Sequence, residues 1–309
     1  MSNPTINQRL NRLTPYMFLA PALIVLAIGL LYPICYMIYA SFLDWNPSQR
    51  IGEADWKGLS NYTGLLADEA FHESFWVTIK FAAIVVIIEM VLGVGLALLL
   101  DRNLKGMAAL RTIFILPMMI APIVVGMVWR YMYHPSVGII NRTLDDLGLG
   151  KVAWTSDGTA AFWSIVIADI WQWTPFIFIL ALAALQSLPR SALEAARIDG
   201  ATQWQQIIYI KLPLMMPVLI VTCLLRLIDA FKVLEVILVM TNGGPGLSTE
   251  ILALRISRTA SEFRELGEAA AMSNFLLILL LVLTVAMFLY NKAVEVRAAR
   301  VRAAREEDA

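Results

Sequence analysis

Charged residues are scarce in this 309-residue chain, and cysteine and histidine are scarcer still. Asp, Glu, Lys and Arg make up only 16% of it, against about 25% in a typical soluble domain. The formal net charge is zero, so bulk charge suggests neither nucleic acid nor an acidic substrate as a partner. Cys35 and Cys223 both lie in apolar runs, which argues against a disulfide framework, and two histidines are too few for a metal-ligand cluster.

Sequence motifs of common enzymes are missing as well. A phosphate-cradling loop needs glycine, four residues and then Gly-Lys-Ser/Thr. The nearest approach, Gly150-Lys151-Val152, has Asp145 where the first glycine is required and fails at two positions. "HESFW", from His72, begins like a zinc-protease helix but ends in tryptophan, and no Gly-x-Ser-x-Gly elbow occurs. We therefore expect a chain that is not itself an enzyme and that holds no metal or cofactor.

Apolar residues are abundant, at 59% of the chain, and the mean hydropathy is +0.71. Six apolar segments are long enough for the roughly 20 residues that a helix needs to cross the hydrocarbon. The predicted spans are 16–41, 75–100, 111–133, 160–186, 213–240 and 269–290. The first is longer than the apolar stretch of about 7–15 residues in a cleaved signal peptide, so we interpret it as a retained span. The predicted fold class is an all-α polytopic membrane protein with six transmembrane helices.

The placement of lysine and arginine predicts the orientation. With the N-terminus inside, the inner segments hold 13 Lys/Arg and the outer segments hold 7, and four more lie within spans. The inner segments are 1–15, 101–111, 187–212 and 291–309, and the outer segments are 42–74, 134–159 and 241–268. The positive-inside rule then places both termini in the cytoplasm. The predicted organisation is a cytoplasmic segment at 1–15, one transmembrane domain at 16–290 and a cytoplasmic tail at 291–309.

A short polar segment, "SALEAARIDGATQWQQIIYIKLP", separates the fourth and fifth predicted spans. Ser191 and Glu194 have the spacing of a capping box, so we expect a helix to begin at Ser191. Gly200 suits the left-handed position that follows a helix. A second, amphipathic helix is expected to begin near Thr202, and Pro213 suits the first turn of the fifth span. From these residues alone, the segment could equally be a well-capped cytoplasmic loop.

The predicted fifth span carries Arg226, Asp229, Lys232 and Glu235, which alternate in sign at three-residue spacing. Four charges cost roughly 10–14 kcal/mol at the membrane centre, whereas the sixteen Leu, Ile, Val and Phe residues between 214 and 239 return only about 5–10 kcal/mol. We therefore expect the charges to be paired, or to face protein or water. One interpretation is that they line a translocation path, and the other is a ladder of ion pairs that only fixes helix packing.

Four further side chains are unusual at their depth in the spans. Glu89 and Asp169 are single carboxylates that could partner the cations of the fifth span. Trp171 and Trp173 are too deep for the interfacial aromatic belt, so they either pack between helices or contact a solute.

Outside the spans, the stretch 257–270 predicts one amphipathic helix at the outer surface.

Three stretches of the chain resemble the sugar-permease branch of binding-protein-dependent ABC importers. "EAARIDGATQWQQIIYIKLP" is similar to the cytoplasmic signature of these permeases, Glu-Ala-Ala, three residues, Gly-Ala and later Ile-x-Leu-Pro. The matching residues are Glu194, Ala195, Ala196, Asp199, Gly200, Ala201, Ile210, Leu212 and Pro213. "LTPYMFLAPALIVLAIGLLYPICYMIYASFLDWN" resembles the first span of that branch, and "NGGPGLSTE" resembles the outer loop after the fifth span. The resemblance therefore covers almost the whole chain.

The resemblance implies the transmembrane domain of a type I ABC importer in a bacterial plasma membrane. It implies that a coupling helix docks on a cytoplasmic ATPase dimer, which binds ATP and Mg²⁺ in place of this chain. The implied coupling residues are Glu194, Ala195, Ala196, Asp199 and Gly200. The candidate path residues are Arg226, Asp229, Lys232, Trp171 and Trp173. The other implied partners are a second, homologous permease, an extracytoplasmic solute-binding protein and membrane lipid.

The implied function is ATP-driven uptake of a sugar, polyol or small glycoside by alternating access. One alternative is a permease for a phosphorylated or sulfonated organic anion, which Arg226 and Lys232 would help to neutralise. An alternative of another class is an ion-coupled secondary transporter, with Asp169, Asp229 or Glu235 as its ion site. The cytoplasmic signature argues against this class, because a secondary carrier has no ATPase to dock.

Overall fold

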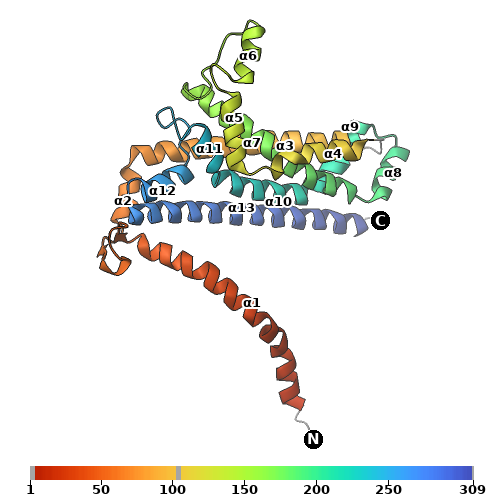
Figure 1. Ribbon diagram of the computed structural model, residues 1–309. Helices are drawn as coiled ribbons and strands as arrows, with labels where there is room; N and C mark the ends of the chain where they lie inside the picture. The colour runs from red at the N-terminus through yellow and green to blue at the C-terminus, as the bar shows by residue number, and fades with distance from the viewer. Residues whose placement is uncertain (1–3, 102–105, 308–309) are drawn as a thin grey trace. The chain divides into compact units, whose positions relative to one another are not determined.

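The protein is described by a computed structural model that covers residues 4–101 and 106–307. It is almost entirely helical (Figure 1). Thirteen α-helices occur within these ranges: α1 (Pro4–Ala40), α2 (Ser60–Ala67), α3 (Glu69–Leu100), α4 (Met107–Ile115), α5 (Pro122–Met132), α6 (Ile139–Asp146), α7 (Gly158–Gln186), α8 (Arg190–Ile198), α9 (Gln203–Gln206), α10 (Leu212–Phe231), α11 (Glu235–Met240), α12 (Leu252–Ser261) and α13 (Leu266–Glu307).

Shorter elements complete the chain. They are the 3₁₀-helices η1 (Ile51–Glu53) and η2 (Leu116–Met119), the π-helix η3 (Ile207–Lys211), and the antiparallel strands β1 (Leu43–Asp44) and β2 (Asp55–Trp56). The ends of the predicted cytoplasmic segment and tail, residues 1–3 and 308–309, lie outside the described residues, as does 102–105.

Five helices are long and apolar enough to cross a membrane, and one bent pair raises the number to six if it counts as one span. The five segments are 18–40, 69–100, 158–186, 203–240 and 266–292. The bent pair joins 109–119 to Pro122–Met132. These six segments coincide with the six predicted spans, so the structure agrees with an all-α polytopic membrane protein.

The predicted third span, 111–133, is not one straight helix. Its two halves meet at an angle of 96°. Pro122 explains the break, because its nitrogen cannot donate a hydrogen bond and its ring disfavours helical geometry in the preceding residue. Ala121 accordingly has ψ 134°, and α5 begins afresh with Pro122 in its first turn.

The predicted fifth span, 213–240, is broken as well. Helix α10 ends at Phe231, and Leu234, at φ −135° and ψ −54°, lies outside helical geometry before α11 begins at Glu235. Lys232 therefore lies in the break. The four charges predicted at three-residue spacing therefore do not lie on one continuous helix, because two of them precede the break, one lies in it and one follows it. No proline or glycine occurs here, and nothing in the structure explains this break.

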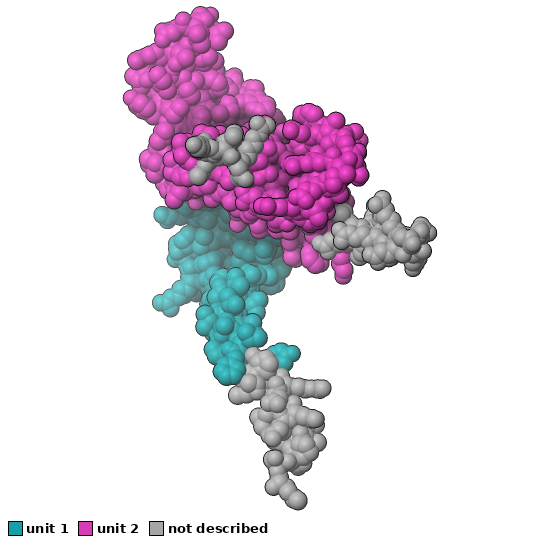
Figure 2. Space-filling view, turned by 90° about the vertical axis from the view of Figure 1, so that its right-hand side faces the viewer, with its two compact units in different colours: residues 1–67, 256–277 teal, residues 68–255, 278–309 magenta. Residues whose placement is uncertain are grey.

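The chain divides into two compact units, which Figure 2 distinguishes by colour. Unit 2 comprises residues 68–255 and 278–309, and its core is built by α3, α7 and α10, which pack against one another. Gly93 of α3 lies so close to α7 that an added Cβ would be 2.7 Å from Cγ2 of Ile177. Gly93 and Ala97 are both buried, so this pair of small residues allows close helix approach.

Unit 1 comprises residues 1–67 and 256–277. The buried Asn61 donates hydrogen bonds to the carbonyl oxygens of Ser41 (2.8 Å) and Leu43 (3.0 Å), which fixes the end of α1 against α2. The single helix predicted at 257–270 is wrong: α12 ends at Ser261 and α13 begins at Leu266. Arg264, with φ 61°, occupies the turn between them, and a left-handed residue cannot continue a right-handed helix.

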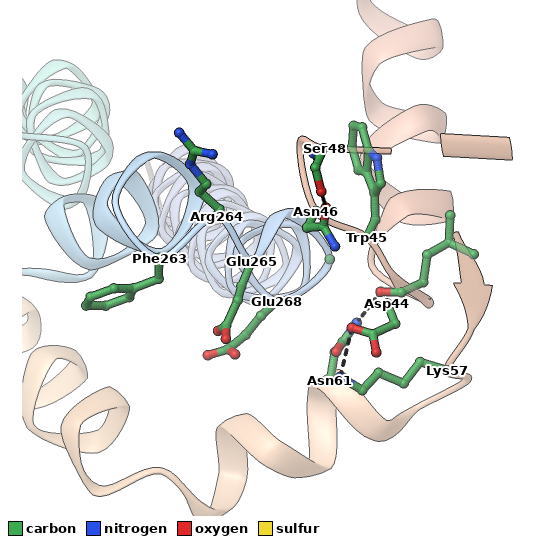
Figure 3. A pocket seen from close by; sticks show the side chains of 12 residues that line it. Asp44, Trp45, Asn46, Ser48, Lys57, Asn61, Phe263, Arg264, Glu265 and Glu268 are labelled. Carbon is green, nitrogen blue, oxygen red and sulfur yellow. Dashed lines mark hydrogen bonds and ion pairs between the residues drawn. The ribbon is translucent and has the colours of Figure 1, made fainter. Parts of the chain in front are cut away.

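A polar cavity of about 380 Å³ lies in unit 1, between the β1–β2 loop and the turn that joins α12 to α13 (Figure 3). Lys57 and Asp44 line it and form an ion pair at 3.2 Å, with side chains 41% and 67% exposed. Glu265 and Glu268 line its other wall. An ion pair this exposed contributes at most about 1 kcal/mol, so the cavity wall does not depend on it.

Candidate functional site

A fully buried cluster of three charged side chains lies in the core of unit 2. Arg226 of α10 donates from Nε to Oε2 of Glu89 (2.6 Å) and from Nη2 to Oε1 of Glu89 (2.9 Å). The same Nη2 also pairs with Oδ2 of Asp169. The three side chains are at most 1% exposed. Both intramembrane carboxylates therefore contact one cation of the fifth span, although they come from α3 and α7.

The buried cluster ties three helices together. Burying a charge is costly unless it contacts an opposite charge in good geometry, and Arg226 meets this condition through its two-bond contact with Glu89. The cluster nevertheless holds two carboxylates and only one guanidinium. Its formal charge, with all three groups ionised, is therefore one negative unit in a nearly solvent-free position.

A cavity of about 170 Å³ adjoins the buried cluster. Both chain breaks contribute to its wall, the first through Pro122 and the second through Lys232, Val233, Glu235 and Val236. Its lining residues are Pro122, Asp169, Trp173, Arg226, Asp229, Lys232, Val233, Glu235 and Val236. Discontinuous helices that meet at a cavity with charged lining residues are a recurring way to build a solute site in membrane proteins.

The four charges of the predicted stripe have different environments. Arg226 is buried, whereas the side chains of Asp229 and Lys232 are 45% and 55% exposed and form an ion pair at 3.4 Å. Glu235 is also exposed. Arg226 therefore takes part in helix packing, and Asp229, Lys232 and Glu235 line the cavity with side chains that are not buried. The translocation path stays a prediction.

The two candidate tryptophans are placed differently. Trp173 lines the cavity, and its ring centre lies 5.5 Å from Cζ of Arg226, in cation–π contact. Trp171 does not line the cavity; it is 42% exposed and lies edge-on to Trp129, with ring centres 5.9 Å apart. The structure brings together four of the five candidate path residues and leaves Trp171 apart.

Two side chains that sequence reasoning missed bind the segment around α5 to neighbouring helices. The fully buried Gln172 of α7 donates to the carbonyl oxygen of Ile120 (3.0 Å), two residues before α5 begins. Arg130 of α5 donates to the carbonyl oxygen of Val239 in α11 (2.9 Å). Gln172 follows Asp169 by three residues and so shares its helix face, a spacing that could have identified it.

The polar segment between α7 and α10 folds differently at its start from the prediction. Helix α8 begins at Arg190 after the N-cap residue Pro189, and no side chain caps it. The capping box expected from Ser191 and Glu194 is therefore wrong. Glu194 is exposed within the helix and available for other contacts.

The coupling residues lie on α8 and in the turn after it. Glu194, Ala195, Asp199 and Gly200 are exposed, and Ala196 is buried. Gly200 has φ 77°, as expected, and Ala201 N donates to the carbonyl oxygen of Ala196 (2.9 Å). This bond over five residues closes the helix as a glycine C-cap does.

The turn after Gly200 is held by a capping box. Thr202 Oγ1 accepts from Gln205 N (3.3 Å), and Gln205 Oε1 accepts from Thr202 N (2.8 Å), so the second helix begins near Thr202 as predicted. A groove of about 340 Å³ follows it, lined by Asp199, Gly200, Ala201, Gln205, Tyr209 and Ile210. Large apolar side chains are exposed around the turn: Ile198 at 87%, Trp204 at 73% and Tyr209 at 74%. Such a patch marks a surface for a protein or membrane partner.

Comparison with known proteins agrees with these features. Residues 89–300 match the family described as "Binding-protein-dependent transport system inner membrane component". The trehalose/maltose transport system permease protein MalF of Thermococcus litoralis is 36% identical over 87% of this chain and 90% of its own length. The probable starch degradation products transport system permease protein AmyD of Thermoanaerobacterium thermosulfurigenes is 34% identical over 85% and 89%.

The fold also has a close counterpart among solved structures. A chain from the crystal structure of a bacterial ABC transporter involved in the import of the acidic polysaccharide alginate superimposes with a TM-score of 0.81. The match covers 94% of this chain and 99% of that chain, at 24% sequence identity. At this identity the likeness concerns the fold alone, and it extends over nearly the whole length.

Proposed function

This chain belongs to the family of binding-protein-dependent transport system inner membrane components, and we propose that it translocates a sugar, polyol or small glycoside as the permease subunit of an ABC importer. The assignment of the solute class rests on one observation. Two relatives, at least 34% identical to this chain, are named for transport of trehalose/maltose and of starch degradation products. The predicted family and the predicted type I importer fold are thereby confirmed.

The two alternatives are not favoured. An ion-coupled secondary transporter belongs to another class of protein, and family membership argues against it. The organic-anion alternative depended on Arg226 and Lys232, but Arg226 is already paired with two carboxylates and Lys232 with Asp229. The cavity therefore has no positive charge in excess of its carboxylates for a phosphate or a sulfonate.

The cavity between the two chain breaks is our candidate for part of the translocation path. Trp173 offers a flat apolar face, and Asp229 and Lys232 offer exposed hydrogen-bonding groups, a combination that suits a ring with hydroxyl groups. Arg226 would hold the surrounding helices in register. In alternating access the path opens to one side at a time, and the two breaks are where α5 and α11 could change direction. Trp171 stays a prediction, since its ring lies outside this cavity.

Energy would enter through the segment 190–200. The resemblance of Glu194, Ala195, Ala196, Asp199 and Gly200 to a coupling helix supports docking of an ATPase dimer, which would bind ATP and Mg²⁺. The exposed apolar side chains around Gly200 offer the contact area that such docking requires. A second permease, a solute-binding protein and lipid complete the proposed assembly, with a heterodimer of permeases as the preferred form.

Deletion of the gene should abolish uptake of one carbohydrate, and a plasmid copy should restore it. Uptake of radiolabelled trehalose, maltose, sorbitol and glycerol 3-phosphate would be measured in the deletion strain and in the complemented strain. We expect loss for a neutral carbohydrate and retained uptake of glycerol 3-phosphate. Loss of the phosphorylated solute alone would favour the anion alternative. Uptake that a protonophore abolishes while cellular ATP is maintained would contradict an ATP-driven importer.

The proposed cytoplasmic location of both termini requires α8 to lie inside and the loop before α7 to lie outside. In a background without Cys35 and Cys223, cysteine at the exposed Ser156 should react with an impermeant maleimide in spheroplasts. Cysteine at the exposed Gln203 should react only after permeabilisation. The reverse labelling pattern would contradict the proposed orientation, whereas a normal melting temperature in both variants would show that the substitutions themselves are tolerated.

A further inference from the structure

One buried oxygen atom of a residue that lines the 170 Å³ cavity has no hydrogen-bond partner among the described residues. It is Oδ1 of Asp169, although Oδ2 of the same side chain pairs with Arg226. A buried acceptor without a partner costs about 1–3 kcal/mol, so a donor or a cation at this position would be stabilising.

The charges around the cavity point to a cation. The carboxylates of the cluster and the cavity belong to Glu89, Asp169, Asp229 and Glu235, and the cations are Arg226 and Lys232. With all six groups ionised, the formal excess is two negative charges. Asp169 is buried, so water screens its charge poorly.

The cavity has the size and the lining for a small cation. A volume of about 170 Å³ accommodates several water molecules or one compact charged group. Trp173 lines the cavity together with Asp169, and its aromatic ring already faces one cation, the guanidinium of Arg226, at 5.5 Å. An anion would instead meet the excess of carboxylates.

We propose that the cavity between Asp169 and Asp229 binds one small, positively charged group. The group is either an inorganic monovalent cation or the ammonium group of a solute, and both offer the same chemistry to Oδ1 of Asp169. If the group is the ammonium group of a solute, this inference rests on the proposed function, which assigns the cavity to the translocation path. If it is an inorganic cation, the ion acts as a counter-ion of the site. ATP drives transport in both cases.

Thermal unfolding of the purified full-length chain in lipid nanodiscs tests this proposal at constant ionic strength. In the first arm, choline chloride is replaced by sodium chloride or potassium chloride. The choline cation is the reference because it is larger than these ions and has no N–H group. The other arm compares glucosamine with uncharged N-acetylglucosamine. We expect one of these exchanges to raise the melting temperature by about 3 °C or more, because ligand binding stabilises the folded state. The arm that responds identifies the source.

Asp169→Asn should remove that shift, since it keeps an oxygen for Arg226 and deletes one negative charge. Asp145→Asn is the matched control: Asp145 is also ion-paired, with Lys151 at 3.6 Å, but lies in an exposed position. If Asp169→Asn does not fold, two other measurements test the proposal. Asp229→Asn must reduce the melting-temperature shift, and binding of ⁸⁶Rb⁺ to the wild-type chain measures an inorganic cation directly. No shift in either arm, or an equal shift in Asp169→Asn, would overturn the proposal. The melting-temperature and ⁸⁶Rb⁺-binding measurements do not depend on transport. A negative result in them can therefore be distinguished from a negative result in the uptake assay.

Discussion

Arg226→Met should prevent the chain from assembling in the membrane. The substitution leaves Glu89 and Asp169 buried side by side without a counter-charge, and removing one partner of a buried ion pair costs about 3–5 kcal/mol. That is a large part of the 5–15 kcal/mol that stabilises a typical folded domain. The measurements are the yield of detergent-extracted, monodisperse chain and its melting temperature.

Lys232→Met is the matched control for this prediction. Its ion pair with Asp229 is about half exposed on both sides, and such pairs contribute about 0–1 kcal/mol. Its yield and melting temperature should therefore stay close to those of the wild type. A normal melting temperature for Arg226→Met would contradict the packing role of the cluster.

A triple variant separates the packing role from a transport role. Arg226→Met combined with Glu89→Gln and Asp169→Asn removes all three charges, and a neutral replacement of a buried ion cluster is often tolerated. We expect this variant to recover most of the lost yield. Full uptake by the recovered variant would show that the buried charges serve packing only. Recovered assembly with lost uptake would place them in the path.

The sequence could predict that Arg226 needs a partner, but not which one. The free-energy cost of an unpaired charge in a span is a local property, whereas Glu89 and Asp169 lie 137 and 57 residues away in the chain. Only the packing of α3, α7 and α10 brings them together. Gln172 was missed for the same reason, since its partner at Ile120 becomes apparent once the chain break is known.

Local signals differed in how well they predicted backbone geometry. Gly200 was placed correctly because a left-handed residue after a helix has a strong preference for glycine, and this preference needs no tertiary contact. Ser191 was misplaced as a cap because α8 begins one residue earlier, at Arg190, and Ser191 lies inside its first turn. The bend at Pro122 follows from proline chemistry, whereas the break at Leu234 has no counterpart in the sequence.

Gly200→Val should uncouple the permease from its ATPase. Gly200 has φ 77°, which costs a β-branched residue about 1–2 kcal/mol or more, while an added Cβ has no other atom within 4 Å. The effect is therefore one of backbone strain at the end of α8, without steric overlap. A strain of this size lowers the population of the docking geometry by about tenfold. We expect the ATPase to be lost from the purified complex, or its solute-stimulated hydrolysis to fall by about that factor.

Two further variants make this result specific. Gly200→Asn should retain most of the coupling, because asparagine tolerates the left-handed region much better than valine does. Gly148→Val introduces the same strain after α6, where Gly148 has φ 74° and likewise no atom within 4 Å of an added Cβ, but it lies outside the proposed docking segment. It should leave ATPase association intact. If Gly200→Val keeps normal association and uptake, or if Gly148→Val loses both equally, the segment 190–200 is not the coupling contact, and the exposed apolar side chains around Gly200 must meet another partner.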